Sequence, residues 1–459
     1  MMDQFPAGVV EGFYGPPWSH SARVNMIKFL GKNGFNIYIY APKDDPYHRE
    51  KWAEPYPRDL LGRLAELVDV SNRSGVSFCF AISPGLSMTY SSENDLDKLT
   101  SKFREVAKLG IRWFGLFLDD IPQEFQHEQD KRAYKSLGEA HAHLCNRLEK
   151  GLREIAGDGV RLIMCPTQYV GVEPAEYHRA IADGLSPAVY VMWTGKYVLS
   201  PTITGEDADS FGRGIGRKPF LWDNYPVNDY VSQNKVFLGP VKGRTPDLME
   251  HLSGFVSNPM NQEEASKLVL ITYREYFRDH LRYDPDAAWG RAVKELLPRP
   301  IWKDFMAFSE HSRACFLDYS ESQRLEQLVK RVLEKPKELG PLNVLARYLT
   351  RQRRSVNALR QGLKGPLKGE LKPALRKVVL LLEIGIVSTD LLKRTRRGST
   401  KASRKKAKII DSMVHVAQQD ESQVLGELRI LSSMDGRKPV ERDSFILDLA
   451  RLATSSKEE

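Results

Sequence analysis

Residues 113–120 read WFGLFLDD, a short apolar run that ends in two carboxylates. Similar runs recur along residues 1–280. They are rich in Val, Ile, Phe and Tyr and often apolar on both faces, as parallel strands covered on both sides are. We identify eight of them: Gly8–Phe13, Phe35–Ala41, Val76–Ile82, Trp113–Leu118, Arg161–Cys165, Ala188–Met192, Pro219–Leu221 and Gly254–Val256.

Amphipathic helix patterns separate these runs, for example at Ser21–Lys32, Asp59–Asn72 and Leu96–Leu109. Eight strands that alternate with helices predict an α/β fold, a (β/α)8 TIM-like barrel. The structural alternative is an open doubly wound sheet, which more often carries a glycine-rich phosphate loop after its first strand. Glu11–Gly15 (EGFYG) does not match that loop pattern, so the barrel is favoured.

From about residue 295 the strand pattern stops and long helical periodicities follow. They are typical of an all-α helical bundle. We therefore predict two domains, a catalytic barrel over residues 1–295 and a helical bundle domain over residues 296–459. The helical domain could form one wall of the substrate cleft, pair two copies of the chain into a homodimer, or do neither.

The net charge of +9 is unevenly distributed along the 459 residues. Residues 1–300 hold 36 Lys and Arg against 39 Asp and Glu, whereas residues 301–459 hold 32 against 20. The excess includes a dense basic cluster at Lys393–Lys408 (KRTRRGSTKASRKKAK). No aromatic residues interleave there for base stacking, so nucleic acid is not the expected partner and a solvated surface is the simpler interpretation.

The four cysteines lie far apart in the sequence, and Cys79 and Cys165 sit in apolar runs. They are expected to be buried reduced thiols and not a disulfide framework or a zinc site. The N-terminus shows no signal-peptide pattern, and no apolar run is long enough to span a membrane. We therefore expect a cytoplasmic setting.

In a barrel of parallel strands, chemistry resides on the loops that follow the strands. Here most of those positions carry polar or aromatic residues. The segments are Glu11–Gly15, Ala41–Asp45, Ser83–Gly85, Asp119–Asp120, Pro166–Tyr169, Trp193–Gly195, Trp222–Asn224 and Ser257–Pro259. Carboxylates and amides bind hydroxyl groups, and aromatic rings stack on the C–H face of a sugar. The pattern indicates a pocket for a neutral polyhydroxylated ligand.

Asp119 and Asp120 form the most informative pair. Adjacent strand residues point to opposite sides, so both carboxylates can reach one ligand only if the strand turns as it ends. Two such neighbours do not suit the usual glycosidase arrangement, in which the carboxylates flank the scissile bond. They fit better if the substrate supplies the nucleophile, as 2-acetamido sugars do. A metal-binding or helix-capping pair is the alternative, but no histidine cluster converges on these strand ends, and we expect neither metal nor cofactor.

Several longer blocks then point to one family. They are Gly8–Trp18 (GVVEGFYGPPW), Tyr38–Arg49 (YIYAPKDDPYHR), Leu116–Ile121 (LFLDDI), Cys165–Tyr169 (CPTQY), Trp193–Gly195 (WTG), Trp222–Tyr230 (WDNYPVNDY) and Ser257–Pro259 (SNP). In this order they resemble the family 84 glycoside hydrolases, the O-GlcNAcase and β-N-acetylglucosaminidase family. The resemblance covers residues 8 to about 280 and suggests a bacterial-type member without further modules.

The resemblance implies a role for individual residues. Asp119 would orient and polarise the 2-acetamido group, and Asp120 would be the general acid and then the general base. Tyr169 would donate a hydrogen bond near the acetamido group or the leaving oxygen. The remaining implied substrate-binding residues are Gly8, Lys43, Trp222, Asn224, Asp229, Tyr230 and Asn258.

The function implied is that of a retaining exo-β-N-acetylglucosaminidase. It would hydrolyse terminal β-linked GlcNAc, in particular O-GlcNAc on Ser or Thr of glycoproteins, through an oxazoline intermediate. Its partners would be GlcNAc-bearing glycoproteins, glycopeptides or glycans. Two alternatives stay open. One is a hyaluronidase-like endo-acting glycosidase, because the basic C-terminal region could attract an acidic polysaccharide. The other is a non-catalytic GlcNAc-binding protein, although a binding protein would need no proton donor.

Overall fold

A computed structural model describes most of the chain as two compact units. One unit comprises residues 1–229 and 241–284, and the other comprises residues 230–240 and 285–459. Within them the structure describes residues 5–229, 235–313, 315, 322–335, 338–396, 410, 414 and 445–455.

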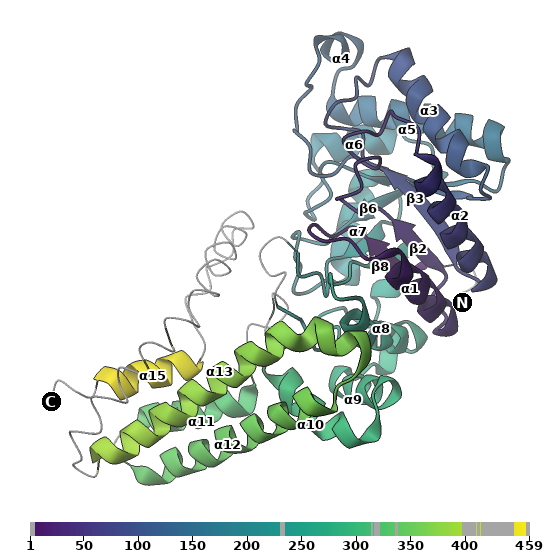
Figure 1. The fold of residues 1–459 in the computed structure, drawn as a ribbon. Helices are drawn as coiled ribbons and strands as arrows, with labels where there is room; N and C mark the ends of the chain where they lie inside the picture. Colours follow the sequence, from purple (N-terminus) through teal and green to yellow (C-terminus); the bar gives the residue numbers. More distant parts are fainter. Residues whose placement is uncertain are drawn as a thin grey trace. The chain divides into compact units, whose positions relative to one another are not determined.

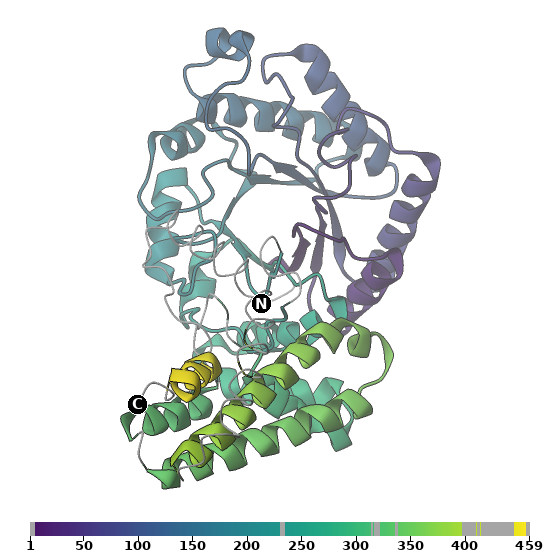
Figure 2. The ribbon, with the colours of Figure 1, turned by 60° about the vertical axis from the view of Figure 1, so that its left-hand side comes forward.

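The first unit is built around a closed ring of eight parallel strands (Figures 1 and 2). The strands are β1 (Ala7–Glu11), β2 (Ile37–Tyr40), β3 (Ser77–Ile82), β4 (Trp113–Phe117), β5 (Arg161–Cys165), β6 (Val189–Trp193), β7 (Phe220–Asp223) and β8 (Gly254–Ser257). Each strand pairs with the next in sequence, and β8 pairs with β1 to close the ring. The predicted (β/α)8 barrel is therefore confirmed.

Helices surround the ring, and Figure 2 looks into it with the helices outside. They are α1 (His20–Lys32), α2 (Arg58–Arg73), α3 (Glu93–Ala107), α4 (Glu128–Ala133), α5 (Leu137–Ala156), α6 (Glu176–Gly184), α7 (Gly205–Ile215) and α8 (Glu263–Arg278). Side-chain caps begin several of them. Ser19 accepts the amide of Ala22 before α1, and Ser92 accepts that of Asp95 before α3. Such caps satisfy amides that a helix start leaves unpaired.

The barrel interior is filled by side chains and is not a pore. Val10, Ile39, Ala81, Phe117 and Met192 come from five different strands and belong to one buried apolar cluster. Because side chains alternate along a strand, their neighbours face the surrounding helices, which explains why the strand runs are apolar on both faces. All four cysteines are buried, and none of them forms a disulfide within the described part of the chain.

The second unit is helical over its described residues. Its helices are α9 (Pro285–Leu296), α10 (Trp302–Glu310), α11 (Gln323–Glu334), α12 (Leu339–Gly362), α13 (Gly365–Arg396) and α15 (Phe445–Ser455). The long helices α12 and α13 lie side by side (Figure 1), and Gly385 allows a close approach to Leu349. The predicted helical domain is thus confirmed as an architecture.

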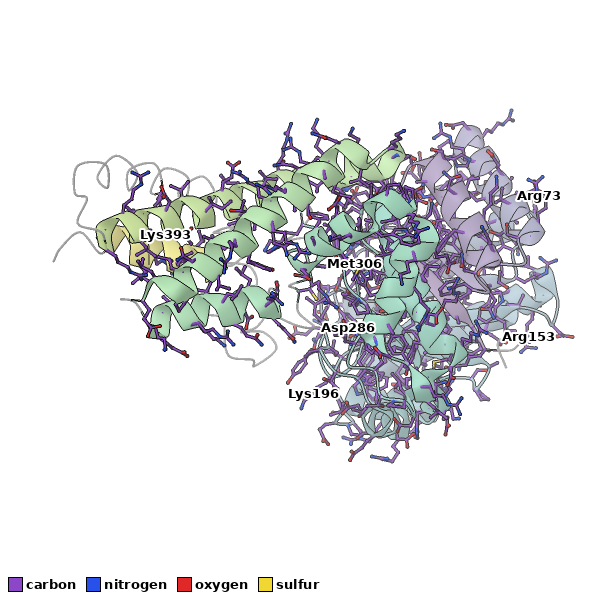
Figure 3. All side chains as sticks on the ribbon, turned by 90° about the horizontal axis from the view of Figure 1, so that it is seen from below. Arg73, Arg153, Lys196, Asp286, Met306 and Lys393 are labelled. Atoms are coloured by element: carbon purple, nitrogen blue, oxygen red, sulfur yellow. The ribbon has the colours of Figure 1, made fainter. Side chains whose placement is uncertain are left out.

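Long polar side chains cover the outer surface of these helices. Figure 3 labels Lys393 near the end of α13. Most of the predicted basic cluster, residues 397–408, lies outside the described residues. In the part of the chain that is described, no helix has the length and apolar character needed to cross a membrane.

A buried ion pair fixes the end of β7. Two nitrogens of the Arg244 guanidinium donate to the Asp223 carboxylate, with Nε 2.7 Å from Oδ2. The Tyr273 hydroxyl on α8 donates to the same Oδ2 at 2.8 Å. Arg244 also donates to the carbonyl oxygens of Ser200 and Lys242. Asp223, one of the polar strand-end residues, is therefore used in the structure of the barrel, where it joins β7, α8 and two loops.

Replacing Asp223 with Ala should lower the free energy of unfolding by about 3–5 kcal/mol, because Arg244 would stay buried without its anion. Urea denaturation would measure the loss. Asp209→Ala is the matched control. Asp209 pairs with His251 at 2.8 Å, and the Asp209 side chain is 48% exposed. The Asp209→Ala substitution should therefore lower the free energy of unfolding by about 1 kcal/mol or less. Equal losses for both variants would contradict the assigned role of Asp223.

Candidate active site

The ends of the barrel strands bring most of the predicted site residues together. Parallel strands place their carboxyl ends at one face of the barrel. The residues found there are Lys43 after β2, Asp119 and Asp120 after β4, Tyr169 after β5, Trp222 at the end of β7, Asn224 just beyond it and Asn258 after β8. Direct contacts join these residues into one network.

Lys43 connects the two carboxylates. Its Nζ lies 2.5 Å from Oδ2 of Asp119 and 3.9 Å from Oδ2 of Asp120. Asp120 has a φ of +53°, in the left-handed region that residues other than glycine seldom adopt. This turn of the backbone is what the sequence argument required, because regular alternation would send the two side chains to opposite sides. A non-glycine residue held there often marks a functional site.

The charge on Lys43 is stabilised by its surroundings. The side chain is buried, which by itself would lower the pKa of its amine, but Asp119, Tyr14 and Asp120 together outweigh that effect and raise the pKa above its ordinary value. Asp119 is 5% exposed, and its Oδ1 is buried and has no hydrogen-bond partner among the described residues. Buried polar atoms are nearly always paired, so this oxygen is a candidate acceptor for a ligand.

Asp120 is held by phenols on both of its oxygens. Tyr14 donates to Oδ2 at 2.7 Å and Tyr169 donates to Oδ1 at 2.9 Å. Burial tends to raise the pKa of the Asp120 carboxyl, but the Lys43 charge and the two phenolic hydrogen bonds outweigh it, and the pKa lies below its ordinary value. The unliganded site therefore favours the charged form of Asp120.

A second part of the network lies around Trp222. The indole Nε1 and the Asn258 side-chain amide both donate to Oδ1 of Asn224 at 2.9 Å. The Asn258 Oδ1 is buried and has no hydrogen-bond partner in the described part of the chain. The Trp222 ring packs on Phe117 and lies 6.0 Å from Lys43 Nζ, which links this part to the carboxylates.

The other predicted site residues are placed differently. Asp229 joins the network through the Tyr14 amide, which donates to its Oδ2 at 2.6 Å. Gly8 lies within β1, where a Cβ would come 1.8 Å from the Ile37 carbonyl oxygen. Tyr230 lies outside the described residues.

Sequence reasoning did not assign Gly12, Tyr14 and Arg49 to the site. A Cβ on Gly12 would lie 2.4 Å from the Trp222 ring. Gly12, in the loop after β1, therefore borders the site. Tyr14 and Arg49 contact Asp120 from two loops. The only available signal was their position within the quoted blocks, because the contacts join residues far apart in sequence.

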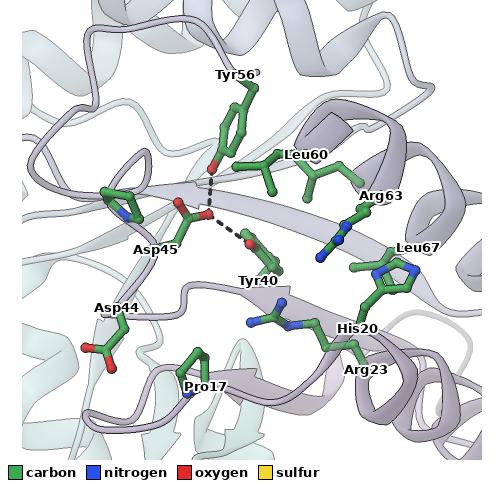
Figure 4. Close-up of a pocket in the computed structure, with 12 residues that line it drawn as sticks. Pro17, His20, Arg23, Tyr40, Asp44, Asp45, Tyr56, Leu60, Arg63 and Leu67 are labelled. Atoms are coloured by element: carbon green, nitrogen blue, oxygen red, sulfur yellow. Dashed lines mark hydrogen bonds between the residues drawn. The ribbon is translucent and has the colours of Figure 1, made fainter. Parts of the chain in front are cut away.

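The loop that carries Lys43 is anchored by Asp45. Its Oδ2 accepts the hydroxyls of Tyr40 and Tyr56 at 2.8 and 2.9 Å, as Figure 4 shows, and its Oδ1 accepts the Tyr47 amide. Asp45, Tyr40 and Tyr56 border a pocket of about 190 Å³ between β2 and the helices α1 and α2. Asp45 therefore pairs with phenols and not with Lys43, which leaves Lys43 to bind the carboxylates.

Glu11 supports the first loop from outside the barrel. Arg23 on α1 donates to both of its oxygens, and the Tyr38 hydroxyl also donates to it.

In the described ranges no group of three or more His, Cys, Asp or Glu side chains could hold a metal ion.

Comparisons with known proteins agree on one family. A family model described as beta-N-acetylglucosaminidase matches residues 7–310. The chain is 34% identical over 284 residues to the protein O-GlcNAcases of Rattus norvegicus and Mus musculus. That match covers 61% of this chain and 30% of each relative, so the chain spans less than a third of their length.

A solved structure covers more of the chain. The structure of a mutant O-GlcNAc hydrolase from Thermobaculum terrenum superposes with a TM-score of 0.82 at 31% identity. The alignment covers 98% of this chain and 94% of the other. The similarity therefore extends over both the barrel and the helical unit.

The ionisation of Asp229 should make stability depend on pH. Burial raises the pKa of its carboxyl to about 6, against an ordinary value of 3.8. Between these values the folded protein keeps a proton that the unfolded chain has released, so stability falls as pH rises. The free energy of unfolding of the wild type should therefore fall relative to that of Asp229→Asn from about pH 4 to 6. A difference in the free energy of unfolding that stays constant with pH would contradict this.

Proposed function

Because the chain belongs to the β-N-acetylglucosaminidase family of glycoside hydrolases, we propose that it is a retaining exo-β-N-acetylglucosaminidase. It removes terminal β-linked GlcNAc, in particular O-GlcNAc on Ser or Thr of glycoproteins, by substrate-assisted catalysis. The observation that carries the proposal is the pair Asp119 and Asp120. Both lie within reach of Lys43 but differ in what binds their oxygens.

Asp119 suits the acetamido group of the substrate. Its Oδ2 is bound by Lys43, while its buried Oδ1 is available to accept the acetamido N–H. As the acetamido oxygen attacks C1, positive charge develops on the nitrogen of the forming oxazoline. A fixed carboxylate in a buried site stabilises such charge more than water does, because it need not reorganise during the reaction.

Asp120 suits proton transfer. It would donate a proton to the leaving oxygen as the C1–O bond breaks, and then take a proton from the water that opens the oxazoline at C1. Each of the two displacements inverts C1, so the product retains the β configuration. The phenols of Tyr14 and Tyr169 favour the charged form of Asp120, which is the form needed to activate water.

The rest of the site would bind the sugar ring. Asn258 offers an unpaired buried acceptor, and Asn224 is held by Trp222 so that its amide orientation is fixed. Asp229 would accept a sugar hydroxyl, and the Trp222 ring would line the pocket beside Gly12. Gly8 and Tyr230 keep the sugar-binding roles that the family resemblance implies.

The proposed substrates are GlcNAc-bearing glycoproteins, glycopeptides or glycans. The four cysteines are buried and form no disulfide among the described residues, which favours a reducing compartment, so we place the activity in the cytoplasm. The helical unit could also mediate a homodimer, which sedimentation measurements on the full chain would detect.

The two carboxylates should be separable by substrate. Asp120→Ala should lower kcat/KM by about 100-fold or more on an alkyl β-GlcNAc, but far less on an activated aryl β-GlcNAc, whose leaving group needs little protonation. Asp119→Ala should slow hydrolysis of both substrates, because the Asp119 carboxylate acts before and during oxazoline formation. Steady-state kinetics on both substrates would show this.

Asp59→Ala, an exposed carboxylate on α2, is the matched control and should leave both rates unchanged. Wild-type rates of hydrolysis in both site variants would contradict the assignment of Asp119 and Asp120 as the catalytic pair. Binding of GlcNAc without turnover by the wild type would favour a binding protein instead.

A further inference from the structure

Arg49 reaches Asp120 both directly and through Tyr14, and the proposed function gives it no role. It lies in the loop between β2 and α2. Its Nη1 donates to the Tyr14 hydroxyl at 2.8 Å, and its Nη2 donates to the Asp120 carbonyl oxygen at 3.2 Å. The guanidinium is a rigid planar fork, so these two bonds fix the Tyr14 hydroxyl relative to the Asp120 backbone.

The first contact sets the direction of the Tyr14 hydrogen bond. A phenol has one hydrogen. Because Arg49 is only a donor, the Tyr14 oxygen must accept from it and can direct its own hydrogen to Asp120 Oδ2, 2.7 Å away. Arg49 thus keeps Tyr14 a donor to the carboxylate.

The second contact supports an unfavourable backbone conformation. Asp120 is the non-glycine residue with positive φ in the described part of the chain, and such a conformation persists only when neighbours hold it. Arg49 holds the carbonyl of that same residue. The turn that places Asp120 beside Asp119 therefore has an identifiable support.

We propose that Arg49 is a positioning residue, which fixes Tyr14 as a donor to Asp120 and holds the left-handed backbone that directs Asp120 toward the substrate. The proposal rests on the proposed function, since Asp120 is taken there as the acid and base. It also distinguishes the two oxygens of Asp120. Oδ2 faces a fixed donor and lies 3.9 Å from Lys43, whereas Oδ1 accepts from Tyr169, which has no comparable anchor among the described residues.

The transferable proton therefore belongs on Oδ1. A proton on Oδ2 would displace the Tyr14 hydrogen bond and lie closer to the Lys43 cation. A proton on Oδ1 requires only that the Tyr169 hydroxyl turn and accept it. Arg49 in this way selects the oxygen that protonates the leaving group.

Two substitutions test this role by kinetics. Charged and titratable groups face Asp120 from five loops: Tyr14, Lys43, Arg49, Asp119, Tyr169 and Asp229. Arg49→Met removes one cation from this set and frees Tyr14, so the pKa of Asp120 should rise. The alkaline limb of kcat/KM on an alkyl β-GlcNAc should then move up by about half a pH unit or more.

The rate of Arg49→Met at the optimum should fall by about tenfold or more on the alkyl substrate, and less on an activated aryl substrate. Arg49→Lys keeps the charge and a donor for the Tyr14 hydroxyl but loses the planar fork that also binds the Asp120 carbonyl, so it should restore the pH profile without restoring the full rate. Arg63→Met, an exposed arginine on α2, is the control and should match the wild type. A uniform loss on both substrates with an unmoved pH limb would overturn the proposal.

A double-mutant cycle tests the route through Tyr14. If Arg49 acts on the carboxylate through this phenol, Arg49→Met should shift the pH limb of Tyr14→Phe much less than that of the wild type. Fully additive shifts would contradict that route.

A crystal structure of Arg49→Met separates this proposal from the proposed function. We expect Tyr14 to move out of hydrogen-bonding distance of Asp120, or Asp120 to leave the left-handed region. If both features persist unchanged, Arg49 does not position them, whether or not the wild type hydrolyses GlcNAc. Failure of the wild type on every β-GlcNAc substrate would instead overturn the proposed function.

Discussion

The buried ion pair between Lys43 and Asp119 is the constraint on which the site depends. Two ions out of water are costly unless their geometry is good and their remaining hydrogen bonds are made. Here Lys43 Nζ reaches both carboxylates, at 2.5 and 3.9 Å, and its cation offsets the repulsion between them. Without it, two adjacent acids could not both lie charged at the end of one strand.

Polar clusters outside the network of Lys43, Asp119 and Asp120 hold the strand ends and the loop that carry this ion pair. Asp45 anchors the Lys43 loop by accepting three hydrogen bonds. Glu11 with Arg23 holds the end of β1, and Asp223 with Arg244 holds the end of β7. Catalytic geometry needs side chains held within a fraction of an ångström, which calls for such supports around a site. Several acidic strand-end residues are therefore structural although their positions resemble those of site residues.

The sequence predicted the parts of this protein that depend on local pattern. The eight apolar runs predicted the barrel strands, and the strand-end positions of Lys43, Asp119 and Asn258 placed them at one face. It could not predict contacts that join distant loops, such as those of Tyr14 and Arg49 with Asp120. Nor does any local signal specify the positive φ of Asp120, because surrounding contacts impose it. The sequence analysis assigned Gly8 and not Gly12 to the site, and only the structure shows that Gly12 borders Trp222.

In the proposed mechanism the substrate's acetamido oxygen is the nucleophile, and one measurement tests this directly. Aryl β-GlcNAc substrates whose acetyl group carries zero, one, two or three fluorines differ mainly in the electron density on that oxygen. If the oxygen attacks C1, kcat/KM should fall steeply and in order as fluorines are added. Rates that do not depend on fluorination would contradict the account, because an enzyme carboxylate or water would then have to be the nucleophile.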